Sequence, residues 1–326
     1  MTTAEVMALS KALTDSVARV VVGKESAVRL LLAALLAERH VLIEDVPGTG
    51  KTTLVKSLAR SLGASFTRLQ FTPDLLPTDV TGFYALDPKT GDLRFRPGPL
   101  FSQVVLVDEI NRASPKTQSS LLEAMEERQV TVDGATHALP RPFLVLATQN
   151  PVEYEGTFPL PEAQLDRFGL RLRLGYPTAE EESLLLRRFI DGDPLAELEP
   201  VASVQDVLEA TAAVRSVYVD DALRRYVVEV AAATRRHPDV VLGASPRCAL
   251  ALVALGQAMA AMAGREYVLP DDIKAVAPSA MTHRILLTPA ARFRDATPDA
   301  VVTAALRQTT VPTDTRPVRS RGAASG

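Results

Sequence analysis

The stretch HVLIEDVPGTGKTT, residues 40–53, decides the fold class. Residues 40–44 form a short apolar run with β-branched side chains, which is typical of a buried strand. A loop rich in proline and glycine follows at 45–50, and the pattern from 51 to 62 is helical. This strand–loop–helix order is the setting of a phosphate-binding loop, in which glycines let backbone N–H groups approach phosphate oxygens.

The loop also carries the side chains that a nucleoside triphosphate needs. Lys51 supplies a positive charge for the β- and γ-phosphates, and the Thr52 hydroxyl can ligate Mg²⁺. The generic pattern G-x-x-x-x-G-K-[ST] has a glycine where this chain has Asp45, so the assignment depends on PGTGKTT and its setting; the alternative is a glycine turn with a solvated lysine. We expect ATP to be bound by Pro47, Gly48, Thr49, Gly50, Lys51, Thr52 and Thr53.

Outward from this loop, strands alternate with helices. Three more apolar runs predict strands at 65–71, 104–107 and 143–147, and SPKTQSSLLEAMEERQ at 114–129 predicts a helix with Ser114 as its N-cap. Such alternation is typical of an α/β fold with a parallel sheet covered on both faces. Earlier in the chain, helices are expected at 3–19 and 21–39. Two hairpins interrupt the alternation, at 83–96 and 129–139, the second around an Asp-Gly turn.

After about residue 176 the pattern changes to helices. Residues 1–176 therefore predict a nucleotide-binding domain, and residues 177–290 a small all-α domain. Residues 291–326 predict a C-terminal helix and a disordered tail. The helices of the second domain are expected at 178–190, 203–216, 219–236, 246–263 and 270–285.

Polar side chains end two of the predicted strands. FSQVVLVDE finishes in Asp108 and Glu109, and FLVLATQN finishes in Asn150. Ligands gather at the carboxyl ends of parallel strands, so we expect these residues beside the phosphate loop. Asp108 is suited to hold Mg²⁺ together with Thr52, and Glu109 to polarise the attacking water. The alternatives are an acidic helix cap for the pair and a simple turn for Asn150.

Composition argues against several classes of protein. The chain has 36 Lys and Arg against 39 Asp and Glu, a net charge of −3, which argues against nucleic acid as a partner. Its single cysteine, Cys248, excludes an internal disulfide framework and fits a reducing compartment. No secretory signal is recognisable, and the most apolar stretch, 249–264, is too short to span a bilayer. These features predict a cytoplasmic protein with no membrane insertion. The four histidines lack ligand spacing, which argues against a metal other than Mg²⁺.

Longer motifs carry a family resemblance. In this order, PGTGKTT, VDEINRASPKTQSSLLEAMEERQVTVDG, ATQNPVEYEGTFPLPEAQLDRF and LGASPR resemble the MoxR family of AAA+ ATPases, over about residues 20–290. The resemblance implies an AAA+ αβα sandwich with a five-stranded parallel sheet in the order 5-1-4-3-2. It further implies a helical lid and a homo-oligomeric ring, commonly a hexamer. The hairpin at 83–96 corresponds to the helix-2 insert of this clade, and that at 129–139 to its presensor hairpin.

The resemblance also implies roles for single residues. By motif, Asn150 matches sensor 1, Arg167 the arginine finger and Arg247 sensor 2, while Val22 and Gly23 border the adenine. Arg247 stands in the first turn of a helix, where a cation opposes the helix dipole, and a local rule broken in this way suggests a site. A pair between Arg247 and a nearby acid is the alternative. For Arg167 the alternative is an ion pair within its own chain.

The function expected from the resemblance is an Mg²⁺-dependent, ATP-driven ring that remodels or matures a protein complex. Its partner would be a client protein with a von Willebrand factor A domain, which Phe83 and Tyr84 could contact; ordinary packing is the alternative for these two. Other classes stay open: a magnesium-chelatase-like metal-insertion subunit, a nucleic-acid motor, and a nucleotide-dependent switch that hydrolyses ATP poorly.

Overall fold

Five short strands form the central sheet of residues 8–211, one of two compact units into which the chain divides. The strands are β1 (Val41–Glu44), β2 (Phe66–Gln70), β5 (Val104–Asp108), β8 (Leu144–Gln149) and β9 (Leu170–Leu172). All of them pair in parallel, in the order β2-β5-β8-β1-β9. Counted along the chain this is the order 5-1-4-3-2, so the expected topology is confirmed. The computed structural model describes residues 1–150 and 156–312.

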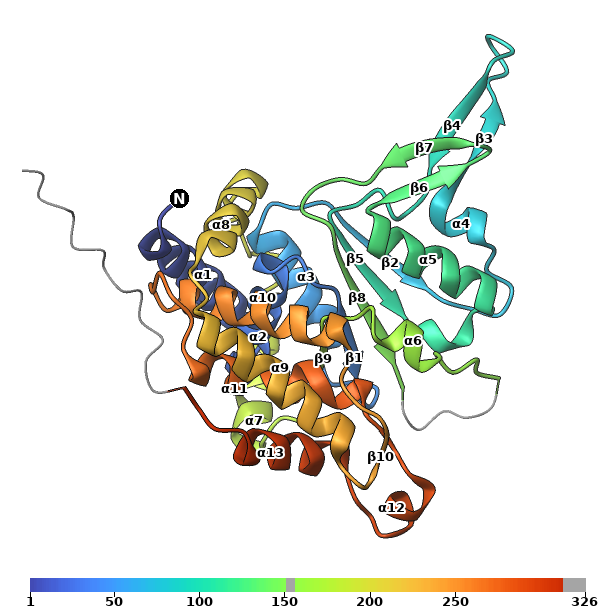
Figure 1. Cartoon of the computed structure of the whole chain (residues 1–326). Coiled ribbons are helices and arrows are strands. Elements are labelled where there is room, and N and C mark those ends of the chain that lie inside the picture. Colours follow the sequence, from blue (N-terminus) through green and yellow to red (C-terminus); the bar gives the residue numbers. More distant parts are fainter. Residues whose placement is uncertain (151–155, 313–326) are drawn as a thin grey trace, which may run out of the picture. The chain divides into compact units, whose positions relative to one another are not determined.

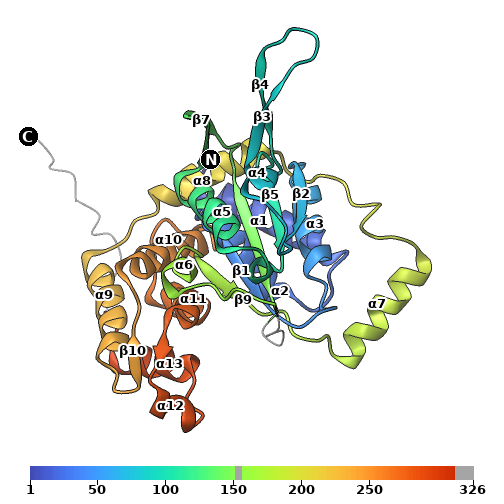
Figure 2. The ribbon, with the colours of Figure 1, turned by 90° about the vertical axis from the view of Figure 1, so that its right-hand side faces the viewer.

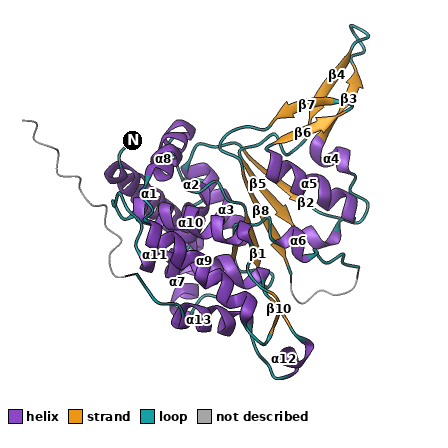
Figure 3. Ribbon diagram, in the orientation of Figure 1, coloured by secondary structure: helices purple, strands orange, loops and turns teal. Residues whose placement is uncertain are grey.

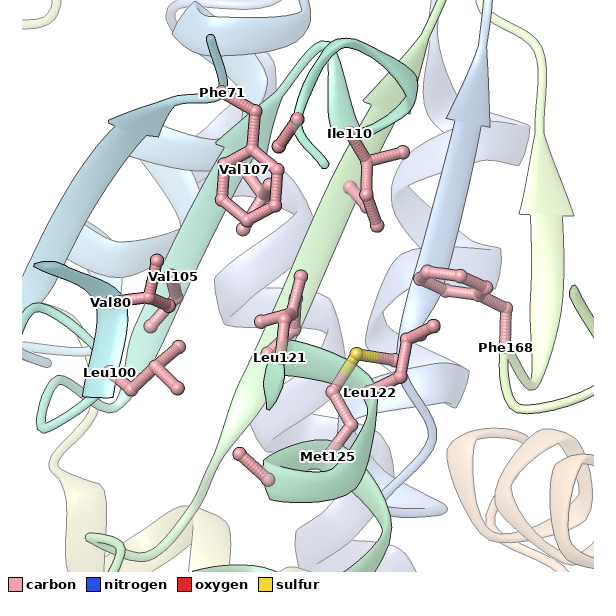
Figure 4. Close-up of a cluster of buried hydrophobic side chains, with 14 of the residues drawn as sticks. Phe71, Val80, Leu100, Val105, Val107, Ile110, Leu121, Leu122, Met125 and Phe168 are labelled. Atoms are coloured by element: carbon pink, nitrogen blue, oxygen red, sulfur yellow. The ribbon is translucent and has the colours of Figure 1, made fainter. Parts of the chain in front are cut away.

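Helices cover both faces of this sheet (Figure 1). The helix α5 (Pro115–Glu127) packs on one face through Leu121, Leu122 and Met125, as the close-up in Figure 4 shows. The helices α2 (Glu25–Leu36) and α3 (Lys51–Ser61) cover the other face. Successive strand residues point to opposite faces. Since Val105 and Val107 join the core beneath α5, Asp108 points to the face that carries α3.

The two predicted hairpins are present and contact each other. The hairpin β3 (Gly82–Leu86) with β4 (Leu93–Pro97) projects beyond the sheet (Figure 2), and β6 (Gln129–Val132) pairs with β7 (Ala135–Ala138). The His137 ring stacks on Phe95 with centroids 3.8 Å apart, and its Nε2 lies 3.1 Å from the Tyr84 hydroxyl. Tyr84 is therefore packed between the hairpins, while Phe83 is 48% exposed.

Residues 1–7 and 212–312 of the described chain belong to the second unit, and this part is mainly helical (Figure 3). It contains α9 (Asp221–Arg236), α10 (Pro246–Met262), α11 (Pro270–Met281) and α13 (Pro298–Gln308). A Cβ on Gly256 of α10 would lie 2.6 Å from the Ile273 Cδ1 atom of α11. The two helices thus approach closely, as the small residues of 249–264 predict. None of the helices in the described chain is long and apolar enough to cross a bilayer.

Two short strands after α9 differ from the helical expectation. An antiparallel ribbon joins β10 (Val240–Leu242) to β11 (Leu286–Leu287), and α12 (Pro289–Phe293) follows. Elements of two to five residues give no periodicity to recognise. The helices α7 (Ala179–Asp191) and α8 (Val204–Ser216) match their predictions, but the compact units divide at 211. The domain boundary near 176 stays a prediction, and most of the predicted tail lies outside the described residues.

Candidate nucleotide site

The loop between β1 and α3 has the backbone of a phosphate-binding loop. Gly48 and Gly50 have φ angles of +82° and +84°, in the left-handed region that side chains with a Cβ rarely adopt. A Cβ on either glycine would meet no atom within 4 Å. Glycine is therefore required by the backbone conformation and not by a lack of space. The α3 helix begins directly at Lys51, which leaves its first N–H groups available to an anion.

Asp45, which stands where the generic pattern has glycine, ties this loop to the end of the sheet. Its carboxylate accepts hydrogen bonds from the backbone N–H of Val46 at 2.8 Å, of Leu174 at 2.7 Å and of Gly175 at 2.8 Å. The side chain is buried, so these bonds are stronger than they would be in water. A glycine would leave the N–H groups of Leu174 and Gly175 without this acceptor, which explains the departure from the pattern.

A cavity of about 390 Å³ brings most of the predicted site residues together. Its wall contains the loop, the ends of β5 and β8, and part of β2. Lys51 bends over the loop and donates from Nζ to the carbonyl oxygens of Asp45 at 3.2 Å and Val46 at 2.6 Å. Of the predicted residues, the lining contains Pro47, Gly48, Thr49, Gly50, Lys51, Thr52, Thr53, Asp108, Glu109 and Asn150.

The two carboxylates at the end of β5 are held in different ways. Asp108 Oδ2 lies 2.6 Å from Arg68 Nε, and its Oδ1 accepts from the Thr148 hydroxyl at 3.2 Å. Glu109 Oε2 accepts from Gln70 Nε2 at 2.6 Å and from Arg112 Nη1 at 3.1 Å.

Glu109 has a left-handed backbone with φ +57°, uncommon for a side chain with a Cβ and a frequent mark of functional sites. Its N–H donates to the Thr148 Oγ1 atom at 2.9 Å. Thr148 therefore links both acids to β8.

A second cavity, of about 380 Å³, adjoins the phosphate loop. Both cavities are lined by Gly48, Thr49, Gly50 and Thr53. The rest of its lining is largely apolar and includes Val20, Val21, Val22, Leu185 and Phe189. An apolar pocket next to the loop suits a flat nucleotide base. Val22 lines this pocket, while Gly23, with φ +69°, follows at the turn into α2 without lining it; that the two residues border the adenine stays a prediction.

Two predicted arginines lie elsewhere in the described chain. Arg167 lines neither cavity, and its Nε lies 3.2 Å from Glu126 Oε2 of α5. This places Arg167 in an ion pair within its own chain. Arg247 stands in the first turn of α10, which Ser245 caps by accepting from the Cys248 N–H at 3.1 Å. That helix belongs to the second unit, and the role of Arg247 stays a prediction.

Sequence reasoning missed four residues of the cavity wall: Arg68, Gln70, Thr148 and Gln149. A signal for the first two was present, because a strand at 65–71 with charged and amide side chains at alternate positions does not fit complete burial. Thr148 lies two residues after the buried Leu146 on β8, and therefore on the same face of the sheet, the face that carries α3.

Comparisons with known proteins agree with this geometry. The family described as "ATPase family associated with various cellular activities (AAA)" matches residues 40–170, and an AAA lid domain matches 232–305. The chain is 52% identical over 305 residues to the uncharacterised protein YeaC of Bacillus subtilis, covering 94% of this chain and 95% of that protein. It is 41% identical to Chaperone MoxR1 of Mycobacterium tuberculosis, covering 95% and 84%.

A crystal structure shows the same fold. A protein of Cytophaga hutchinsonii described as a candidate ATPase superposes with a TM-score of 0.89 at 38% identity, covering 95% of this chain and 97% of that one. Sheet order, phosphate loop and the two domain matches define an ATPase of the AAA+ class. Within that class, the chain belongs to the MoxR family.

Proposed function

We propose that this ATPase works as an Mg²⁺-dependent, ring-shaped motor that remodels or matures a protein complex. The observation that carries the proposal is the common cavity of the phosphate loop, Asp108, Glu109 and Asn150, with an apolar pocket beside it. The relative named Chaperone MoxR1 supports a chaperone-like role. The family resemblance suggests a hexamer and a client with a von Willebrand factor A domain, and we propose the cytoplasm as the place of action.

The donor set on the cavity wall fits Mg²⁺. The Thr52 hydroxyl and the Asp108 carboxylate offer the hard oxygen ligands that this ion prefers, and both line the cavity. No group of three or more His, Cys, Asp or Glu side chains that could hold a metal occurs among the described residues, so the protein would contribute few ligands, and the phosphates and water would supply the rest. When bound, the ion would neutralise charge on the β- and γ-phosphates.

Each remaining step falls to a residue of this chain. The loop N–H groups and Lys51 bind the phosphates. For this, Lys51 Nζ gives up its hydrogen bonds to the carbonyl oxygens of Asp45 and Val46 and donates to phosphate oxygens instead. Glu109 accepts a proton from the attacking water, and Asn150 orients that water or the γ-phosphate. Gln70 and Arg112 both donate to Oε2 of Glu109, so the carboxylate can be held through this oxygen while Oε1 takes the proton.

The position of Arg167 is compatible with the proposed ring. Because Arg167 lines neither cavity of its own unit, we propose that it serves the γ-phosphate bound by a neighbouring subunit. It would leave Glu126 for this purpose when the ring assembles. An arginine supplied in this way is worth roughly 10³–10⁵ in rate.

Glu109→Gln tests the proposal directly. The amide keeps the hydrogen-bonding shape but cannot take a proton, so turnover should fall by roughly 10²–10⁴ while ATP still binds. With ATP and Mg²⁺, light scattering should show a stable ring of this variant. Glu123→Gln, an exposed position on α5, is the matched control and should keep wild-type turnover. Near wild-type turnover by Glu109→Gln would refute the role of Glu109, and a monomer under these conditions would refute the ring.

A further inference from the structure

An arginine occupies the carboxylate that the proposed function assigns to Mg²⁺. Arg68 and Asp108 lie on the neighbouring strands β2 and β5, and Arg68 Nε is 2.6 Å from Asp108 Oδ2. The Asp108 side chain is 9% exposed, whereas that of Arg68 is 51% exposed and lines the cavity. The guanidinium therefore sits between a nearly buried carboxylate and the space in which the phosphates would lie.

Both oxygens of Asp108 are engaged in this arrangement. Oδ1 accepts from the Thr148 hydroxyl at 3.2 Å while Oδ2 faces Arg68. A hydroxyl can remain in place when a cation arrives, but a second cation cannot share the carboxylate without repulsion. Mg²⁺ and the Arg68 guanidinium are thus alternatives at Oδ2.

Arg68 has another anion within the same cavity once it is released. The lining brings it together with the phosphate loop and Lys51. A guanidinium has five N–H donors in a planar fork, which suits phosphate oxygens as well as carboxylates. Moving from Asp108 to a phosphate would replace one charged partner by another, so the exchange costs little.

We propose that Arg68 competes with Mg²⁺ for Asp108: it holds this carboxylate in the nucleotide-free protein and gives it up to the metal–nucleotide complex. The inference rests on the proposed function of the cavity. It makes Arg68 a residue that reduces the dependence of nucleotide binding on Mg²⁺, in two ways. Arg68 must be displaced when the metal binds, and it adds positive charge for the phosphates when the metal is absent.

The measurable quantity is the factor by which Mg²⁺ tightens nucleotide binding. Calorimetry gives the Kd of ATPγS, a slowly hydrolysed analogue, once in excess EDTA and once in saturating Mg²⁺. Partly exposed ion pairs are worth up to about 1 kcal/mol, so Arg68→Ala should increase this factor by roughly 2–5-fold over wild type. Arg68→Lys keeps the charge and should stay close to the wild-type factor.

Controls separate this effect from a general loss of charge or of folding. Arg29→Ala removes an exposed arginine from α2 and should leave the factor unchanged. If Arg68→Ala proves unstable in thermal unfolding, Arg68→Gln replaces it, with the same expected increase. A factor that is unchanged or smaller in the neutral variant would overturn the inference, because Arg68 would then be neutral toward the metal or support it. Failure of the wild-type chain to bind ATPγS at all would overturn the proposed function itself.

Discussion

His40 is a buried residue whose ring nitrogens both have partners. The Val145 N–H donates to His40 Nδ1 at 3.0 Å, so Nε2 carries the proton and donates to the Met125 carbonyl oxygen, also at 3.0 Å. The neutral ring thereby joins β1 to β8 and to α5. Burial is the main cause that lowers the pKa of His40 to about 4, and the nearby Arg128 and Arg39 act in the same direction.

This pKa makes stability depend on pH. Between the ordinary value near 6.5 and the folded value near 4, the unfolded chain binds a proton that the folded chain does not. The free energy of unfolding therefore decreases as the pH falls through this window, by about 2 kcal/mol at pH 5 relative to pH 7. Urea unfolding of the wild type and of His40→Leu at both pH values checks this. The variant should be less stable at pH 7 but should lose less on acidification; an equal loss in both proteins would contradict the assignment.

At the scale of elements, the phosphate loop depends on its attachment to the chain after β9. Asp45→Ala removes one carboxylate that accepts three backbone hydrogen bonds. Because the buried N–H of Leu174 and the partly buried N–H groups of Val46 and Gly175 lose their acceptor, the free energy of unfolding should fall by about 1–3 kcal/mol. Calorimetry should also show weaker nucleotide binding, since the loop loses its anchor. Asp45→Asn keeps one carbonyl oxygen, so its stability and its nucleotide affinity should lie between those of the wild type and of Asp45→Ala.

Asp15→Ala gives the comparison for this prediction. Asp15 forms an exposed pair with Lys11 on α1 (Thr3–Ala18), at 2.6 Å. Such surface pairs contribute little, so this variant should lose less than about 1 kcal/mol. If Asp45→Ala and Asp15→Ala cost the same, the three hydrogen bonds of Asp45 do not anchor the loop.

The elements themselves could be predicted wherever the sequence has a long enough pattern. The strand before the loop, the helix capped by Ser114 and the turn at Asp133 and Gly134 all occur as expected, with Asp133 and Gly134 at φ +48° and +80°. The ribbon of β10 and β11 could not be predicted, because a two-residue strand exists only through its pairing partner.

The same limit holds for the site. The glycines of the phosphate loop and the two acids at the end of β5 could be predicted as site residues from their local sequence. Arg68 becomes a site residue only because β2 lies beside β5. Likewise Asp45 is explained by Leu174 and Gly175, which are 129 and 130 residues away along the chain. Contacts of this kind depend on the sheet order. The alternating polar side chains of β2 indicate that this strand is not completely buried, but they do not indicate which residue Arg68 meets.

At the scale of the whole molecule, the question is whether the active site forms between subunits. If it does, each interface takes Lys51, Asp108 and Glu109 from one chain and Arg167 from the next. Homo-oligomers of Arg167→Ala and of Glu109→Gln should then both be nearly inactive. The rate of the Arg167→Ala ring should fall by roughly 10³–10⁵, because no arginine stabilises the charge in the transition state.

Mixing these two variants should restore ATPase activity. Some interfaces then combine Glu109 of the Arg167→Ala chain with Arg167 of the Glu109→Gln chain, and a single intact interface can turn over. A chain with both substitutions is the control, because its mixture with Glu109→Gln contains no intact Glu109 and should stay inactive. Fluorescently labelled subunits establish that exchange has taken place. Exchange without any recovery of activity would mean that Arg167 acts within its own chain, where its ion pair with Glu126 is then its structural role.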